Sequence, residues 1–119
     1  MELKCKRASA SEAGGEMFQV LFEVSPEQED SPYVLIQRAW LEEEEGAASE
    51  YYVETHEERL IGHYATLQVE LSRNHLTLQL PPPTDETIEI DLTASERSFQ
   101  EIQRVLGIIV QRDLGEEAK

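Results

Sequence analysis

Apolar residues recur at every second position along much of this chain, and this alternation restricts the fold more than any other feature. In residues 16–24, the apolar residues Phe18, Val20 and Phe22 occupy every second position. Successive side chains of a β-strand point to opposite faces of a sheet, so the alternation predicts strands. The same reasoning predicts six or seven strands within residues 2–92, at residues 2–8, 16–24, 33–40, 50–56, 64–71, 76–80 and 87–92.

Short polar segments separate these predicted strands. Residues 8–15 contain two serines and a Gly-Gly pair, which predict a flexible connection, and residues 25–32 contain two prolines, which predict a loop. Residues 72–75 are short enough to form a hairpin turn. Connections of this kind join antiparallel neighbours, so we expect an antiparallel sheet.

The pattern changes after Leu92. Thr93 followed by Glu96 matches a capping box at the start of a helix. From about residue 94 to 113, apolar residues recur at the spacing of an amphipathic helix, namely Phe99, Ile102, Val105, Leu106, Ile109 and Val110. The sheet is the only surface that can bury this stripe. The sequence therefore predicts an α+β fold, with one C-terminal amphipathic helix packed on an antiparallel sheet.

Length and composition predict one domain, residues 1–119, in the cytoplasm. A chain of 119 residues can bury a core without a metal or a disulfide. Cys5 is the only cysteine and cannot form an internal disulfide. No signal-peptide pattern opens the sequence, and no apolar run approaches the roughly 20 residues that a membrane helix needs. We therefore expect no membrane segment.

The formal net charge of −15 is the strongest global feature. It exceeds the magnitude of about 2 to 8 that is ample for the solubility of a small domain. Such a negative field repels nucleic acids and anionic lipid surfaces, and it accelerates encounter with a basic protein. The charge therefore argues against nucleic-acid binding and favours a basic protein partner, although an acidic surface also occurs without any partner.

Aromatic and acidic residues gather around residues 41–49, between two predicted strands. Aromatic side chains are frequent at binding hot spots, and carboxylates attract cationic partners. The predicted partner-binding residues are Trp40, Glu42, Glu43, Glu44, Glu45, Glu50, Tyr52 and Glu54. Trp40 and one of the two tyrosines at positions 51 and 52 could instead pack in the core. Tyr51 and Tyr52 are neighbours in a strand, so they must face opposite ways.

The residues give no support for catalysis or metal binding. Serine, histidine and acidic residues are present, but none lies in a nucleophile elbow. His56, His63 and His75 lack the spacing of a zinc site, and the glutamate run lacks the spaced ligands of a calcium loop. Cys5 is expected to be a small buried residue. We expect no catalytic residue, no metal and no cofactor.

Three sequence blocks add a resemblance. Residues 33–38 read Tyr-Val-Leu-Ile-Gln-Arg, residues 51–54 read Tyr-Tyr-Val-Glu, and residues 69–76 read Val-Glu-Leu-Ser-Arg-Asn-His-Leu. In composition and spacing these blocks resemble the immunity protein 10 family of bacterial polymorphic toxin systems, over residues 33–80. The resemblance implies that the chain neutralises a co-encoded toxin by binding it. Residues 42–45 and 55–58 are less typical of that family.

Two hypotheses about function follow. In the first, the chain is a non-enzymatic immunity protein that binds and neutralises a cognate toxin with a basic surface. In the second, it is an acidic structural or housekeeping domain that associates with itself through an exposed sheet edge. The sequence leaves open whether the chain is a monomer or a homodimer, and an enzyme is the least supported class.

Overall fold

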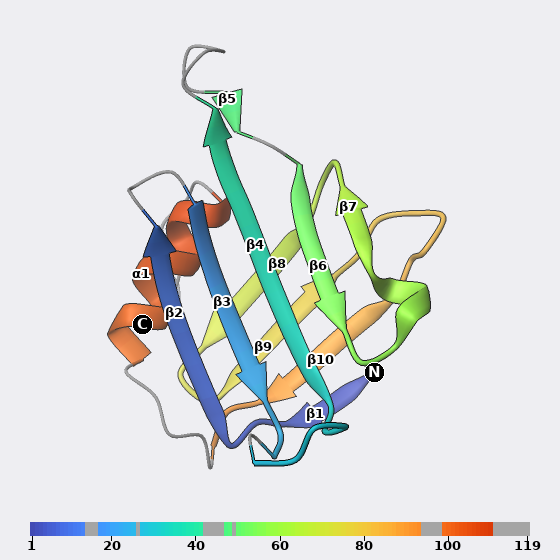
Figure 1. The fold of residues 1–119 in the computed structure, drawn as a ribbon, viewed down its shortest axis with the longest axis vertical. Helices are drawn as coiled ribbons and strands as arrows, with labels where there is room; N and C mark the ends of the chain where they lie inside the picture. Colours follow the sequence, from blue (N-terminus) through green and yellow to red (C-terminus); the bar gives the residue numbers. More distant parts are fainter. Residues whose placement is uncertain (14–16, 26, 42–46, 49, 94–98, 111–119) are drawn as a thin grey trace.

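The computed structural model describes residues 1–13, 17–25, 27–41, 47–48, 50–93 and 99–110 (Figure 1). Two sheets, one α-helix and one short 3-10 helix account for the regular structure of these residues. The smaller sheet contains, in spatial order, β1 (Glu2–Lys4), β10 (Thr87–Asp91), β9 (His75–Gln79) and β8 (Gln68–Ser72). The larger sheet contains β2 (Arg7–Ala13), β3 (Met17–Glu23), β4 (Tyr33–Leu41), β6 (Tyr51–Thr55) and β7 (Gly62–Tyr64).

Two short elements and the helix complete the described structure. The two-residue β5 (Ala47–Ala48) pairs with the end of β4. A short 3-10 helix, η2 (Glu58–Leu60), joins β6 to β7. The helix α1 (Phe99–Val110) is neither long nor apolar enough to cross a lipid bilayer, and this holds for every helix of the described residues.

The core lies between the two sheets and the helix. Figure 1 shows the strands of the smaller sheet crossing behind those of the larger sheet, with α1 behind β2 and β3. The alternating residues of each strand supply the inner faces, so that Val20, Ile36 and Leu78 have no exposed surface. The helix adds its own apolar stripe to the same core, with Ile102, Val105, Leu106 and Ile109 buried.

The chain passes from one sheet to the other at Cys5 and Lys6. The amide of Cys5 donates to Asp91 of the smaller sheet at 2.9 Å, and the amide of Lys6 donates to Glu23 of the larger sheet at 2.8 Å. Cys5 is buried at this corner, as expected, and its thiol donates to the carbonyl of Arg7 at 3.1 Å. The strand predicted at residues 2–8 is therefore divided between β1 and β2, and two successive exposed residues, Lys6 and Arg7, shift the alternation at the corner.

The predicted α+β class is confirmed, but the strand count and the single sheet are wrong. Strand β2 occupies residues 7–13, whereas the sequence predicts a flexible connection over residues 8–15. Its alanines and serines have weak strand propensity, so its pairing with β3 decides the structure. The three-residue β7 was also missed. One pair, β1 with β10, is parallel, and the other pairs in the described residues are antiparallel.

Other expectations agree with the structure. The hairpin at residues 72–75 joins β8 to β9, with Ser72 paired to His75. The predicted helix of residues 94–113 is observed as Phe99–Val110, while residues 94–98 and 111–119 lie outside the described residues. The predicted capping box depends on Glu96, which belongs to the same undescribed segment.

Candidate binding face on the larger sheet

One side of the larger sheet faces away from the core, and its composition distinguishes it from the rest of the surface. The strand register places residues from successive strands in rows across this side. One row contains Ser11, Gln19, Gln37, Tyr52 and His63. The next row contains Ser9, Leu21, Leu35 and Glu54. We call these nine residues the outer face, and they include one carboxylate and no lysine or arginine. The row beyond them on the same side contains Arg7, Glu23 and Tyr33.

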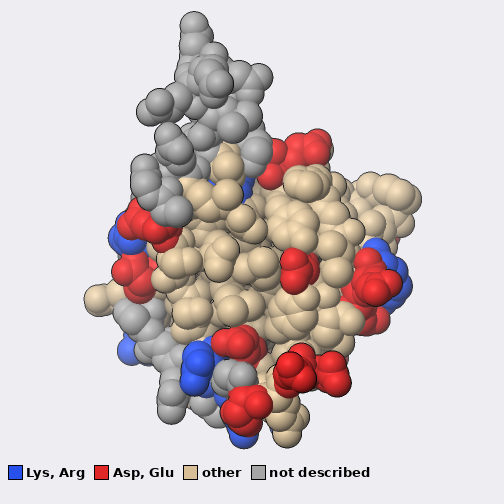
Figure 2. Space-filling model, viewed as in Figure 1, with Lys and Arg blue, Asp and Glu red and all other residues tan. Residues whose placement is uncertain are grey.

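The outward side of the smaller sheet has a different composition. Its rows contain Glu2, Glu89, Thr77 and Glu70, and then Lys4, Asp91, His75 and Ser72. Charged residues of both signs on a strand surface are typical of a solvated face. The outer face is therefore a mostly neutral region on a chain with a net charge of −15. Figure 2 shows it as a broad tan area over β3, β4 and β6, with red acidic groups around its margins.

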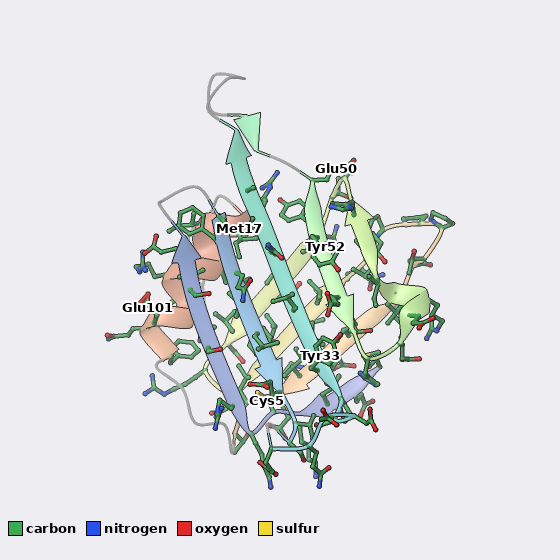
Figure 3. The ribbon with its side chains drawn as sticks, in the orientation of Figure 1. Cys5, Met17, Tyr33, Glu50, Tyr52 and Glu101 are labelled. Carbon is green, nitrogen blue, oxygen red and sulfur yellow. The ribbon has the colours of Figure 1, made fainter. Side chains whose placement is uncertain are left out.

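Two tyrosines and a glutamate form a hydrogen-bonded cluster on this side of the sheet. The hydroxyl of Tyr33 donates to Oε2 of Glu54 at 2.7 Å, and the hydroxyl of Tyr52 donates to Oε1 of the same carboxylate at 2.8 Å. All three side chains are half-buried. Tyr33 comes from the start of β4, whereas Tyr52 and Glu54 come from β6 (Figure 3). We call these residues the Tyr-Glu-Tyr cluster.

Hydrogen bonding favours an ionised Glu54 in this cluster, and burial together with hydrogen bonding favours neutral phenols. The phenol of Tyr33, and then that of Tyr52, lower the pKa of Glu54 by stabilising its ionised form. Burial, and then the hydrogen bond to Glu54, raise the pKa of Tyr33 to about 12. Around neutral pH the cluster therefore carries one negative charge on Glu54, flanked by two neutral phenols.

Tyr33→Phe should raise the pKa of Glu54 toward that of an ordinary glutamate, because it removes the donor that lowers this pKa most. The pKa of Glu54 is lower in the folded than in the unfolded chain. The ionised carboxylate therefore stabilises the fold above its unfolded pKa, and this contribution is lost as the pH falls through the folded pKa. An NMR titration that follows the side-chain carboxyl carbon of Glu54 measures the midpoint directly.

Tyr64→Phe is the matched control for this titration. Its hydroxyl donates to the carbonyl of Leu60, away from the cluster. The control should leave the midpoint of Glu54 where it is in the unmodified protein. A midpoint of Glu54 that is the same in Tyr33→Phe as in the unmodified protein would contradict the assigned hydrogen bond.

Two shallow hollows lie on this side of the sheet. The first, of about 310 Å³, is lined by Tyr33, Glu54, Leu21, Leu35 and Pro32, with Glu23 and Glu29 among its other residues. The second, of about 390 Å³, is lined by Tyr52, His63, Gln37, Met17, Ala39, Arg38 and Glu50. The Tyr-Glu-Tyr cluster contributes to both hollows, so it occupies the middle of the concave part of this surface.

Compared with known protein families, with curated proteins and with solved structures, the chain matches none of them. The resemblance to the immunity protein 10 family accordingly stays a prediction.

The structure brings together three of the predicted partner-binding residues. Tyr52 and Glu54 lie on the outer face, and Glu50 is exposed beside the second hollow. The backbone of Trp40, in β4, pairs with that of Ala48, in β5. The side chain of Trp40 lies outside the described part of the molecule. The remaining predictions, Glu42, Glu43, Glu44 and Glu45, also lie outside the described residues.

The opposite orientation of the two adjacent tyrosines is confirmed. Tyr51 is buried in the core, while Tyr52 lies on the outer face and its ring centroid is 5.2 Å from that of His63. Arg38 packs on the inner side, with its guanidinium carbon 4.0 Å from the centroid of the Tyr51 ring. Arg38 thus reaches the core side of the sheet even though it also lines the second hollow.

The three histidines lie in different surroundings. His56 accepts a hydrogen bond from the amide of Tyr33 at 3.4 Å, His63 lies beside Tyr52, and His75 is 3.2 Å from Glu89. Among the residues that the structure describes, no three histidine, cysteine or acidic side chains are grouped as a metal site would require.

Sequence reasoning missed several residues of this surface. The sequence predicts Tyr33 only as part of a strand, and it gives no sign of a binding role for Leu21, Leu35 and Gln37. The alternation did place Tyr33, Leu35 and Gln37 on one side of β4. That signal could have found them, had the covered side of the strand been known.

Proposed function

We propose that the protein is a non-enzymatic binding module that holds a basic protein partner against the outer face of its larger sheet. The contrast between the two outward sides carries this proposal. The outward side of the smaller sheet presents charged residues to the solvent, whereas that of the larger sheet presents half-buried leucines, glutamines and Tyr52. A mostly neutral surface with aromatic groups loses little on desolvation and suits a protein interface.

The charge of the chain supports a basic partner. Acidic residues lie beside the outer face, as Glu23 and Glu29 do at one hollow and Glu50 does at the other. Carboxylates at the rim of an interface increase the rate of encounter with a cationic protein and select against anionic ones. The predicted contributions of Trp40 and the glutamates at 42–45 belong to this proposal.

The resemblance over residues 33–80 gives the class of partner, because members of that family are predicted to neutralise co-encoded toxins. We therefore propose a cognate toxin domain, bound in the cytoplasm of the bacterium that produces both proteins. Blocking a toxin by occupying its surface needs no catalytic residue and no cofactor in the blocking protein.

Co-expression in bacteria tests this function. The probe is the C-terminal domain of a large secreted protein encoded by the adjacent reading frame, expressed from an inducible promoter. Cells that also express this chain should keep growing, whereas cells with the toxin domain alone should stop. Growth arrest in both strains, or an adjacent frame that encodes no such protein, would contradict the proposed function.

Gln37→Lys tests the proposed surface. Gln37 lies at the centre of the outer face, so a lysine there should repel a basic partner and weaken binding by at least about tenfold, which corresponds to 1.4 kcal/mol. The affinity for the purified toxin domain is measured by calorimetry. Thr77→Lys is the matched control, because Thr77 is equally half-buried at the centre of the opposite surface.

Equal affinities for the toxin domain in the two lysine variants would reject the outer face as the docking surface. The same samples also test self-association through a sheet edge. A homodimer that forms at the same concentration in both variants and in the absence of any toxin domain would favour the second hypothesis.

A further inference from the structure

We propose that the Tyr-Glu-Tyr cluster is a receptor for one arginine side chain of the protein partner. This inference rests on the proposed function and makes it more specific, since it assigns the chemistry at the centre of the interface. The receptor consists of the carboxylate of Glu54, the phenols of Tyr33 and Tyr52, and the adjoining hollow on the side of Tyr33.

The first argument is the charge of Glu54. Some carboxylates of the described surface have cationic partners, as Glu86 does with Arg59 at 3.4 Å and Glu12 with Arg104 at 3.1 Å. Within the described residues, no lysine, arginine or histidine lies within ion-pair distance of Glu54. Two neutral phenols hold this carboxylate in place instead. A fixed negative charge in the middle of a neutral surface complements one cationic group of a partner.

The second argument is the hydrogen-bonding capacity that remains in the cluster. An ionised carboxylate offers about four lone-pair sites, and the two phenols occupy two of them. Each phenol oxygen also keeps lone pairs that can accept a hydrogen bond. Four oxygens, two of the carboxylate and two of the phenols, therefore present acceptors and no free donor. A planar guanidinium carries five N–H donors in a fixed fork and matches such a set better than a compact ammonium does.

The third argument is the shape and lining of the hollow. Leu21, Leu35 and Pro32 give it an apolar floor, on which the aliphatic stem of an arginine can lie while its charged end reaches Glu54. The ring of Tyr33 offers a face for a cation. The hollow has a volume of about 310 Å³, which is at the lower limit for small-molecule pockets, so the hollow suits one side chain better than a separate ligand.

Short peptides test the receptor without any toxin domain. The probe is acetyl-Gly-Arg-Gly-amide, and its neutral analogue contains citrulline in place of arginine. NMR titration should show saturable shifts of the ring signals of Tyr33 and Tyr52 with the arginine peptide. Citrulline keeps the shape but loses the charge, so we expect its peptide to bind at least about tenfold more weakly.

Glu54→Gln should weaken binding of the arginine peptide at least about tenfold, because it removes the charge and keeps the size of the side chain. Glu70→Gln is the matched control, since Glu70 is an exposed strand residue on the opposite surface. The control should bind the peptide as the unmodified protein does. If the cluster only joins β4 to β6, Glu54→Gln changes the melting temperature and leaves peptide binding unchanged, and this result would overturn the proposal.

The two proposals fail separately. Loss of protection in the co-expression test with normal peptide binding rejects the toxin as partner and keeps the arginine receptor. Full protection by Glu54→Gln, together with failure of Gln37→Lys to protect, keeps the outer face and rejects the receptor. Equal binding of the arginine and citrulline peptides also rejects the receptor.

Discussion

Phe22→Ala should lower the free energy of unfolding by about 3 to 5 kcal/mol, the range typical of removing a buried phenylalanine ring. Phe22 has no exposed surface and lies in β3, between β2 and β4. The surrounding strands are tied by their hydrogen bonds and cannot close on the space that the ring leaves. Urea unfolding followed by circular dichroism measures the change. The slope of the free energy of unfolding against urea concentration should stay the same as in the unmodified protein.

Leu21→Ala provides the matched control in the same strand. Leu21 is the neighbour of Phe22, but it is half-buried on the outer face and only part of its side chain is removed from water. We expect a loss of about 1 kcal/mol or less, in proportion to the smaller buried area. Comparable losses in the two variants would contradict the assignment of the inner and outer sides of the larger sheet.

Arg38→Met should cost about 2 to 3 kcal/mol of stability, although methionine matches the aliphatic stem of arginine in length and is more apolar. Nη1 of Arg38 donates to the carbonyl of Ile109 at 2.7 Å, near the C-terminal end of α1. A cation near the carbonyl end of a helix interacts favourably with the helix dipole. The guanidinium also packs on the ring of Tyr51, and methionine replaces neither interaction.

Thermal unfolding of Arg38→Met and Arg104→Met separates this contact from a general effect of lost charge. Arg104 pairs with Glu12 and Glu101, and half of its side chain surface is exposed. Exposed ion pairs contribute about 0 to 1 kcal/mol, so the control should melt close to the unmodified protein. A larger loss in Arg104→Met than in Arg38→Met would contradict the proposed tie between β4 and the helix.

The alternation of apolar residues predicted the strands whose inner faces form the core. It located β3, β9 and β10 with the correct face inward, because each has one covered and one open side. It failed at β2, where small residues carry little strand preference and the neighbouring strand determines the conformation. It also failed at the corner of Cys5 and Lys6, because only two successive exposed residues, Lys6 and Arg7, mark the change of sheet and no glycine or proline accompanies them.

The binding face was predicted only in part, for a related reason. Tyr52 and Glu54 were named because their residue types suit an interface, and both lie on the outer face. Their hydrogen-bonded neighbour Tyr33 is separated from them by about 20 positions, so only the pairing of β4 with β6 reveals the cluster. Arg38 shares a side of β4 with Val34 and Ile36, and the sequence gives no sign that the helix end would receive it.

The parallel pairing of β1 with β10 affects when the molecule can fold during translation. Glu2 lies opposite Glu89 in this pair, so strands near the two ends of the described chain must meet. The hairpin of β8 and β9 can form as soon as it leaves the ribosome, since its partners are adjacent in sequence. The first strand has to wait for residues 87–91 to emerge, and contacts so distant in sequence form slowly. Nascent chains in which residues 87–91 have not yet emerged should therefore keep β1 accessible to chaperones and proteases.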